Sequence, residues 1–126
     1  MSLIRLEVGG FYRFGVQGGP RPVDVWVGRI DEPADLGHKV VQPVVSLVVT
    51  SMRPGMPLIG IAPFYLSALY GEGVAAINAF PMKVIDFAQN YADWRASWEA
   101  GEAAIWNKGP SEVYAEVIRQ MAESTT

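Results

Sequence analysis

The sequence contains no cysteine among its 126 residues. This absence excludes disulfide bonds, thiolate nucleophiles, iron–sulfur clusters and cysteine-based zinc sites. Charge is also scarce, because Asp, Glu, Lys and Arg make up only 18% of the chain and the net charge is −3. Half of the residues are apolar. We therefore expect residues 1–126 to bury a core and to fold as a single domain, and not to remain disordered.

Long apolar segments are missing as well. The longest aliphatic stretch, Val40 to Val49, is interrupted by Gln42, Pro43 and Ser46, so it falls short of the roughly 18 residues that cross a bilayer. The N-terminus shows no basic segment followed by a long apolar one. These absences predict no membrane partner and a cytoplasmic location.

Turn-forming residues are concentrated in the first two thirds of the chain. Eleven of 13 glycines fall at or before Gly73, and eight of nine prolines fall at or before Pro81. The charges divide at nearly the same place, with seven basic and six acidic groups in residues 1–85, but three basic and seven acidic groups in residues 86–126. The sequence thus predicts an α+β fold with a β-rich part over 1–83 and a helical part over 84–126.

The first part contains several short segments that are typical of strands. Val23–Gly28 alternates valine with other residues, which is the period of a strand, and Phe11–Phe14 forms a hairpin with it through a glycine- and proline-rich loop. Seven of the eleven residues in Val40–Thr50 are β-branched, a density that favours strand over helix. Pro43 places this strand at a sheet edge or in a bulge, because proline has no amide hydrogen to donate.

Two further apolar segments complete the sheet. Leu58–Ala62 and Val74–Phe80 are expected to be strands, and Pro63–Tyr70 between them is expected to be a turn or a helix. Five short strands bounded by glycine and proline predict a small, strongly bent antiparallel sheet or an SH3-like barrel over about residues 3–80.

The last third changes to a helical period. Phe87 and Trp98 belong to a set of residues spaced alternately by three and four, which all lie on one stripe of a helix; the set is Val84, Phe87, Tyr91, Trp94, Trp98, Gly101 and Ile105. Asp86 is the predicted N-cap with Gln89 completing a capping box, and the helix is expected to stop at Gly109. A second helix is expected to begin at Ser111 and to bury Tyr114, Ile118 and Met121.

No residue of the chain is assigned a catalytic role. His38 is the only histidine, and no Gly-x-Ser-x-Gly elbow accompanies it. Asp31, Glu32 and Asp35 do not have the regular spacing of a calcium loop, so no metal is expected. The glycines of residues 15–19 join two strands and do not lead into a helix, which disfavours a phosphate or cofactor site.

The leading hypothesis is a non-catalytic module that associates with itself, as a homodimer, or with a protein partner. The aromatic stripe is wide for one small sheet, so we expect Trp94, Trp98, Ile105 and Trp106 to pack partly against a second copy. The first alternative is a small-molecule binding domain or minor enzyme. Its ligand site is expected at Trp26, Arg29, Asp31 and His38, where polar groups gather near the ends of two strands.

A second alternative is a weak single-stranded nucleic-acid binder. Arginines and aromatic residues occur together in the sheet region, which is the mixture used by stacking platforms; they are Arg5, Arg13, Arg21, Arg29 and Arg53 with Phe11, Tyr12, Phe14 and Trp26. The negative net charge opposes this alternative, because few counterions would be released on binding.

Overall fold

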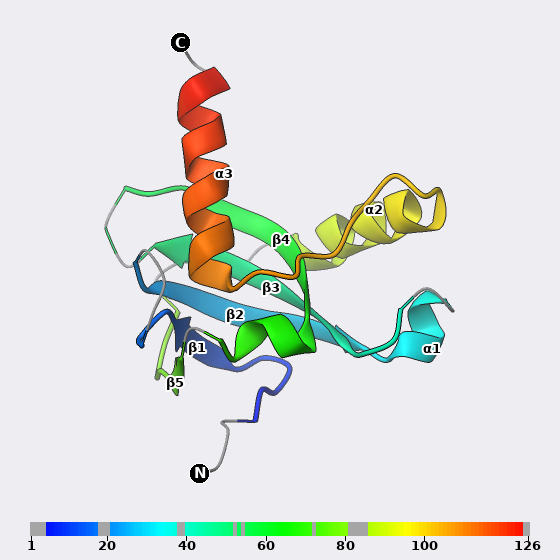
Figure 1. The fold of residues 1–126 in the computed structure, drawn as a ribbon, viewed down its shortest axis with the longest axis horizontal. Coiled ribbons are helices and arrows are strands. Elements are labelled where there is room, and N and C mark those ends of the chain that lie inside the picture. The colour runs from blue at the N-terminus through cyan, green and yellow to red at the C-terminus, as the bar shows by residue number, and fades with distance from the viewer. Residues whose placement is uncertain are drawn as a thin grey trace.

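The computed structural model describes residues 5–17, 21–37, 40–51, 53, 55–71, 73–80 and 86–124. Five strands with two short helices between them are followed by two longer helices, as Figure 1 shows. No helix in these ranges is both long and apolar enough to cross a membrane. The elements are β1 (Phe11–Phe14), β2 (Val23–Asp31), α1 (Pro33–Leu36), β3 (Val44–Ser51), β4 (Leu58–Tyr65), η1 (Leu66–Leu69), β5 (Val74–Ala76), α2 (Phe87–Glu99) and α3 (Pro110–Ser124).

The five strands form one antiparallel sheet in the order β4-β3-β2-β1-β5. The predicted α+β class and the hairpin of β1 with β2 are therefore confirmed. The predicted barrel closure is not found, because β4 and β5 stand at opposite edges of the sheet.

The two longer helices lie on opposite faces of this sheet. Val25 and Val27 are fully buried in the main core together with Val113 of α3. Trp26, whose side chain points to the other face, contacts Phe87 of α2 with the two ring centroids 5.3 Å apart. Successive side chains of a strand point to opposite faces, so the alternation in β2 distributes valines to α3 and the indole to α2.

A bulge at Gly28 reverses this alternation. Val27 pairs with Leu47 and Arg29 pairs with Ser46, so Gly28 is one extra residue in β2. As a result, Arg29 and the residues after it change faces. A Cβ on Gly28 would lie 2.2 Å from the ring of Phe87, which explains why only glycine fits under α2 at this point.

A second irregularity lies under the same helix. The pairing of β3 with β4 shifts between Leu47 and Val49, and the extra residue in β4 falls next to Gly60. A Cβ on Gly60 would lie 2.9 Å from the amide nitrogen of Asn90 in α2. Both glycines therefore lie directly under α2, but only Gly28 faces a ring, whereas Gly60 faces the end of the Asn90 side chain.

Helix α2 begins where the sequence predicts but ends earlier. Asp86 is the N-cap, but it makes no side-chain capping bond, and Gln89 donates to Asp93 instead; the predicted capping box is wrong. The helix ends at Glu99 because Gly101 adopts a left-handed conformation, with φ of 78°. Ile105 therefore lies outside the helix, whereas Val84 lies outside the described residues.

Other boundaries also differ from the prediction. β3 lies inside the sheet and begins at Val44, after Pro43. Pro43 is therefore not part of the ladder, and its lack of an amide hydrogen requires neither an edge position nor a bulge. β4 continues through Pro63 to Tyr65 and is followed by the short 3-10 helix η1. The short helix α1, which is not predicted from the sequence, forms with Pro33 at its start.

Helix α3 leaves the sheet along its length. Val113 and Tyr114 are buried, Ile118 is partly buried, and Met121 is 47% exposed. Figure 1 shows the end of α3 projecting beyond the sheet. The amide of Val113 donates to the carbonyl of Gly109. The first hydrogen bond of α3 therefore starts at Gly109, where the sequence predicts that the preceding helix stops.

We predict that Gly28→Ala destabilises the fold by about 1–3 kcal/mol, because the new methyl group overlaps the ring of Phe87. Urea denaturation followed by tryptophan fluorescence measures the change. Gly71→Ala is the matched control, since a Cβ there meets no atom within 4 Å. Equal stability of both variants would contradict this role of Gly28.

Candidate ligand-binding site

Three of the four residues predicted to bind a ligand lie under α2. Trp26 meets Phe87 edge to face. Asp31 is only 1% exposed and accepts hydrogen bonds from Tyr91 Oη at 2.6 Å and from Arg29 Nε at 2.9 Å. The fourth residue, His38, lies outside the described residues.

These polar groups are bonded to one another and to α2. The guanidinium of Arg29 lies 4.4 Å from the ring centroid of Tyr91, and Arg95 donates to Tyr91 Oη at 3.3 Å and to the carbonyl of Asp35. Burial raises the pKa of Tyr91, and its hydrogen bond to Asp31 raises this pKa further. The contacts hold α2 against β2 and α1; ligand binding by Trp26, Arg29 and Asp31 stays a prediction.

The predicted interface residues pack against the smaller core, line a groove beside β4, or do both. Trp98 donates from Nε1 to the carbonyl of Leu36 at 2.9 Å and stacks on Trp94 at 5.8 Å. Trp94, Trp98 and Ile105 all pack against a second, smaller core made by residues of α1 and the start of β3. Much of the aromatic stripe is therefore covered by its own chain.

The segment after α2 forms a groove with β4. Trp106 donates its amide hydrogen to Pro63 at 2.9 Å and accepts from the amide of Tyr65 at 3.0 Å, so it extends the edge of β4. The groove beside this bridge encloses about 360 Å³. We call it the β4 groove; its lining residues are Ile61, Pro63, Trp94, Ala103, Ala104, Ile105 and Trp106.

The arginine and aromatic set does not form one exposed platform. Arg13 is bound to Asp24 at 2.7 Å, and this hydrogen bond raises the pKa of Arg13. Phe14 is fully buried and Tyr12 is 5% exposed in the main core. Neither of these rings is available for stacking on a nucleic-acid base.

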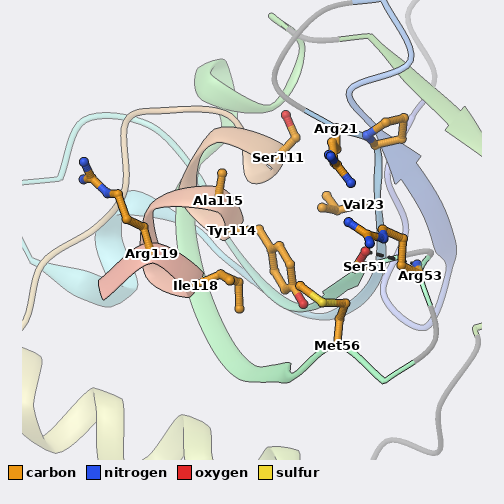
Figure 2. A pocket seen from close by; sticks show the side chains of 11 residues that line it. Arg21, Val23, Ser51, Arg53, Met56, Ser111, Tyr114, Ala115, Ile118 and Arg119 are labelled. Atoms are coloured by element: carbon orange, nitrogen blue, oxygen red, sulfur yellow. Dashed lines mark hydrogen bonds between the residues drawn. The ribbon is translucent and has the colours of Figure 1, made fainter. Parts of the chain in front are cut away.

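A pocket that the sequence does not predict lies between α3 and one end of the sheet. Its volume is about 300 Å³, and we call it the α3 pocket. Figure 2 shows an apolar floor with arginines near its mouth. The pocket is lined by Arg21, Pro22, Val23, Ser51, Arg53, Met56, Ser111, Tyr114, Ala115, Ile118 and Arg119.

Strand register and one helix build this pocket. Val23 at the start of β2 pairs with Ser51 at the end of β3, which brings the two flanking segments together. Tyr114 of α3 donates from Oη to the carbonyl of Pro57 at 2.6 Å, so its ring is fixed as one wall. Burial raises the pKa of Tyr114.

The three lining arginines are not equivalent. In Figure 2, the side chains of Arg21 and Arg53 lie near each other at the mouth of the pocket, whereas that of Arg119 points away from them. The ion pairs among the described residues do not include any of these three. The backbone amide of Arg53 donates to the hydroxyl of Ser51 at 3.1 Å, which ties this arginine to the end of β3.

None of the residues predicted to bind a ligand lines the α3 pocket. In the sequence, Arg21 and Arg53 stand out only as members of the arginine and aromatic set. Each of these arginines lies two residues outside the pair of Val23 and Ser51, which is the last pair of the β2–β3 ladder. Register of this kind cannot be read from hydrophobic alternation when both strands are buried on both faces.

We predict that Tyr91→Phe destabilises the fold by about 1.5–3 kcal/mol, because Asp31 loses a hydrogen bond in a buried site. The raised pKa of Tyr91 means that its stabilising contribution is complete below its ordinary pKa of 10.0 and is lost as pH rises through the higher folded-state value. The variant should therefore lose less stability than the parent in alkaline solution.

Chemical denaturation from neutral pH to above pH 10.0 measures this difference. Tyr65→Phe is the control, because Tyr65 is partly buried beside the smaller core. A Tyr91→Phe variant as stable as the parent, with the same alkaline slope, would show that α2 is held by ring packing alone.

Comparison with known proteins gives no assignment for this fold or for either cavity. No protein-family model matches the chain, and no curated protein or solved structure is significantly similar to it.

Proposed function

We propose that this chain is a non-catalytic module that binds a small molecule in the α3 pocket. The observation that carries the proposal is an apolar cavity of about 300 Å³ with polar groups gathered at its mouth. Small-molecule sites are concave, mostly apolar and fitted with a few well-placed polar groups. The small-molecule alternative derived from the sequence is thus retained, with a different set of residues.

The walls of the pocket favour binding without large rearrangement. Val23 and Ser51 belong to paired strands, and Tyr114 is fixed by its bond to Pro57. Met56 adds a flexible thioether that adapts to the shape of a bound group. A site with rigid walls loses less conformational entropy when it closes on a ligand.

The composition of the lining favours binding over catalysis. The lining residues include two serines but no histidine, aspartate or glutamate. A serine needs a neighbouring general base to become a nucleophile, and an arginine does not take up a proton at neutral pH. The described lining residues therefore include groups that hold a ligand, but no histidine or carboxylate that could act as a general base.

We predict that Ala115→Phe blocks the pocket. Ala115 is exposed on α3 and lines the cavity, so a phenyl group fits without disturbing the core. Titration with a panel of small amphipathic molecules, followed by NMR of the alanine and isoleucine methyl groups, should shift the signals of Ala115 and Ile118. The variant should weaken this binding by at least about tenfold.

Ala96→Phe is the matched control, since Ala96 is exposed on α2 and does not line the pocket. It should bind the same compounds as the parent. Shifts scattered over the surface, or binding that survives Ala115→Phe unchanged, would count against the proposal.

Self-association is a second candidate function, and the β4 groove supports it. Three of the four predicted interface residues, Trp94, Ile105 and Trp106, line this groove. Trp94 Nε1 is buried without a hydrogen-bond partner among the described residues. A second copy seated on the groove would cover these aromatic and aliphatic side chains and remove further apolar surface from water.

We predict that Ala104→Glu converts a dimer to a monomer, because it places a charge on an exposed position of the β4 groove. Sedimentation velocity over a wide range of protein concentration measures the change. Ala96→Glu adds the same charge on α2, outside the groove, and should leave the dimer intact. A parent protein that remains monomeric throughout would overturn this second candidate.

A further inference from the structure

We infer that the ligand of the α3 pocket is an organic carboxylate, with its oxygens between Arg21 and Arg53 and a naphthalene-sized apolar body on the floor of the pocket. This inference rests on the proposed function and adds the chemical class of the ligand. It follows from two like charges at the mouth of the pocket.

The two arginines flank the end of the ladder between β2 and β3. Val23 and Ser51 form the last pair of this antiparallel ladder, and each arginine lies two residues beyond it. Both line the α3 pocket, and Figure 2 shows their side chains near each other at its mouth. Like charges held close together repel each other.

Two other arginines of the sheet are paired with carboxylates. Arg13 faces Asp24 across β1 and β2, with Nε and Oδ1 2.7 Å apart. Arg29 is bound to the buried Asp31 at 2.9 Å. Among the described residues, no carboxylate forms an ion pair with Arg21 or Arg53. An anion supplied from solution therefore completes the pattern that Asp24 and Asp31 complete elsewhere.

The geometry of guanidinium groups favours a carboxylate. Each group presents N–H donors in a planar fork that matches the two oxygens of a carboxylate. The floor beside the fork is apolar, with Tyr114, Met56 and Ile118 among its residues. An aromatic body fits this floor, because its ring can lie against the ring of Tyr114 and contact the thioether of Met56.

Four naphthalene derivatives with the same ring system test the class of ligand. The probes are 2-naphthoate, its primary amide, 2-naphthalenemethanol and 2-naphthylmethylamine, measured by isothermal titration calorimetry at low salt. We expect the carboxylate to bind at least about tenfold more tightly than the amide and the alcohol, and the amine to bind weakest. Added salt should reduce the advantage of the carboxylate.

Three substitutions test whether Arg21 and Arg53 cause the preference for the carboxylate. Arg21→Gln and Arg53→Gln should each abolish the preference for the carboxylate over the alcohol. Arg119→Gln is the matched control, because Arg119 also lines the pocket but its side chain points away from the other two. The control should keep the preference within about twofold.

A measurement without any ligand tests the like-charge contact itself. At low salt, Arg21→Gln and Arg53→Gln should each raise the midpoint of thermal unfolding, and the double variant should gain little more than either single variant. Arg119→Gln should not raise the midpoint. Additive gains, or losses in both single variants, would overturn the repulsive pairing.

The outcomes separate this inference from the proposed function. Equal binding of all four naphthalene probes in the α3 pocket would overturn the carboxylate class and leave small-molecule binding intact. A carboxylate preference that survives both arginine substitutions would also overturn it. If no probe binds and the arginine substitutions leave the unfolding midpoint unchanged, both the class of ligand and the site are wrong.

Discussion

A single extra residue in β2 sets the arrangement of the two helices around the sheet. Without the bulge at Gly28, regular alternation would place Arg29 and Asp31 on the same face as the buried valines of β2. The bulge turns both side chains to the opposite face, where Asp31 binds Tyr91 of α2. β2 therefore supplies both the carboxylate that binds α2 and the buried valines that pack against α3.

The aromatic residues of α2 derive their role from this anchor. Phe87 lies over the bulge, Tyr91 reaches Asp31, and Trp94 stacks on Trp98. The rings form a continuous row from Trp26 to Trp98, and the last of them donates to the carbonyl of Leu36. Tyr91 is buried by these contacts and the other rings of the row are partly buried, and the β4 groove remains beside the chain that follows α2.

The α3 pocket lies on the face of the sheet opposite α2. The helix packs against the main core with its first turns and then leaves the sheet, as the falling burial from Val113 to Met121 shows. A cavity forms where the helix separates from the strand ends. The β2–β3 ladder ends here at the pair of Val23 and Ser51, and Figure 2 shows Arg21 and Arg53 near the opening.

Local patterns in the sequence predict the elements that depend on nearest neighbours. Alternation identifies β2, β-branched residues identify β3, and the three- and four-residue spacing identifies the start of α2. The same patterns miss the end of α2, because a left-handed Gly101 interrupts a stripe that continues to Ile105 in the sequence. They also miss the open sheet, since strand count does not determine which edges meet.

The sequence by itself determined that the chain is α+β and that it has no cysteine chemistry, because composition and period act through residues close in the chain. Only the tertiary structure decided that Asp31 serves as an anchor for Tyr91 and that Arg21 lies beside Arg53. The first of these depends on the bulge in β2, and both bring together segments that are distant in the chain, so neither leaves a local mark in the sequence.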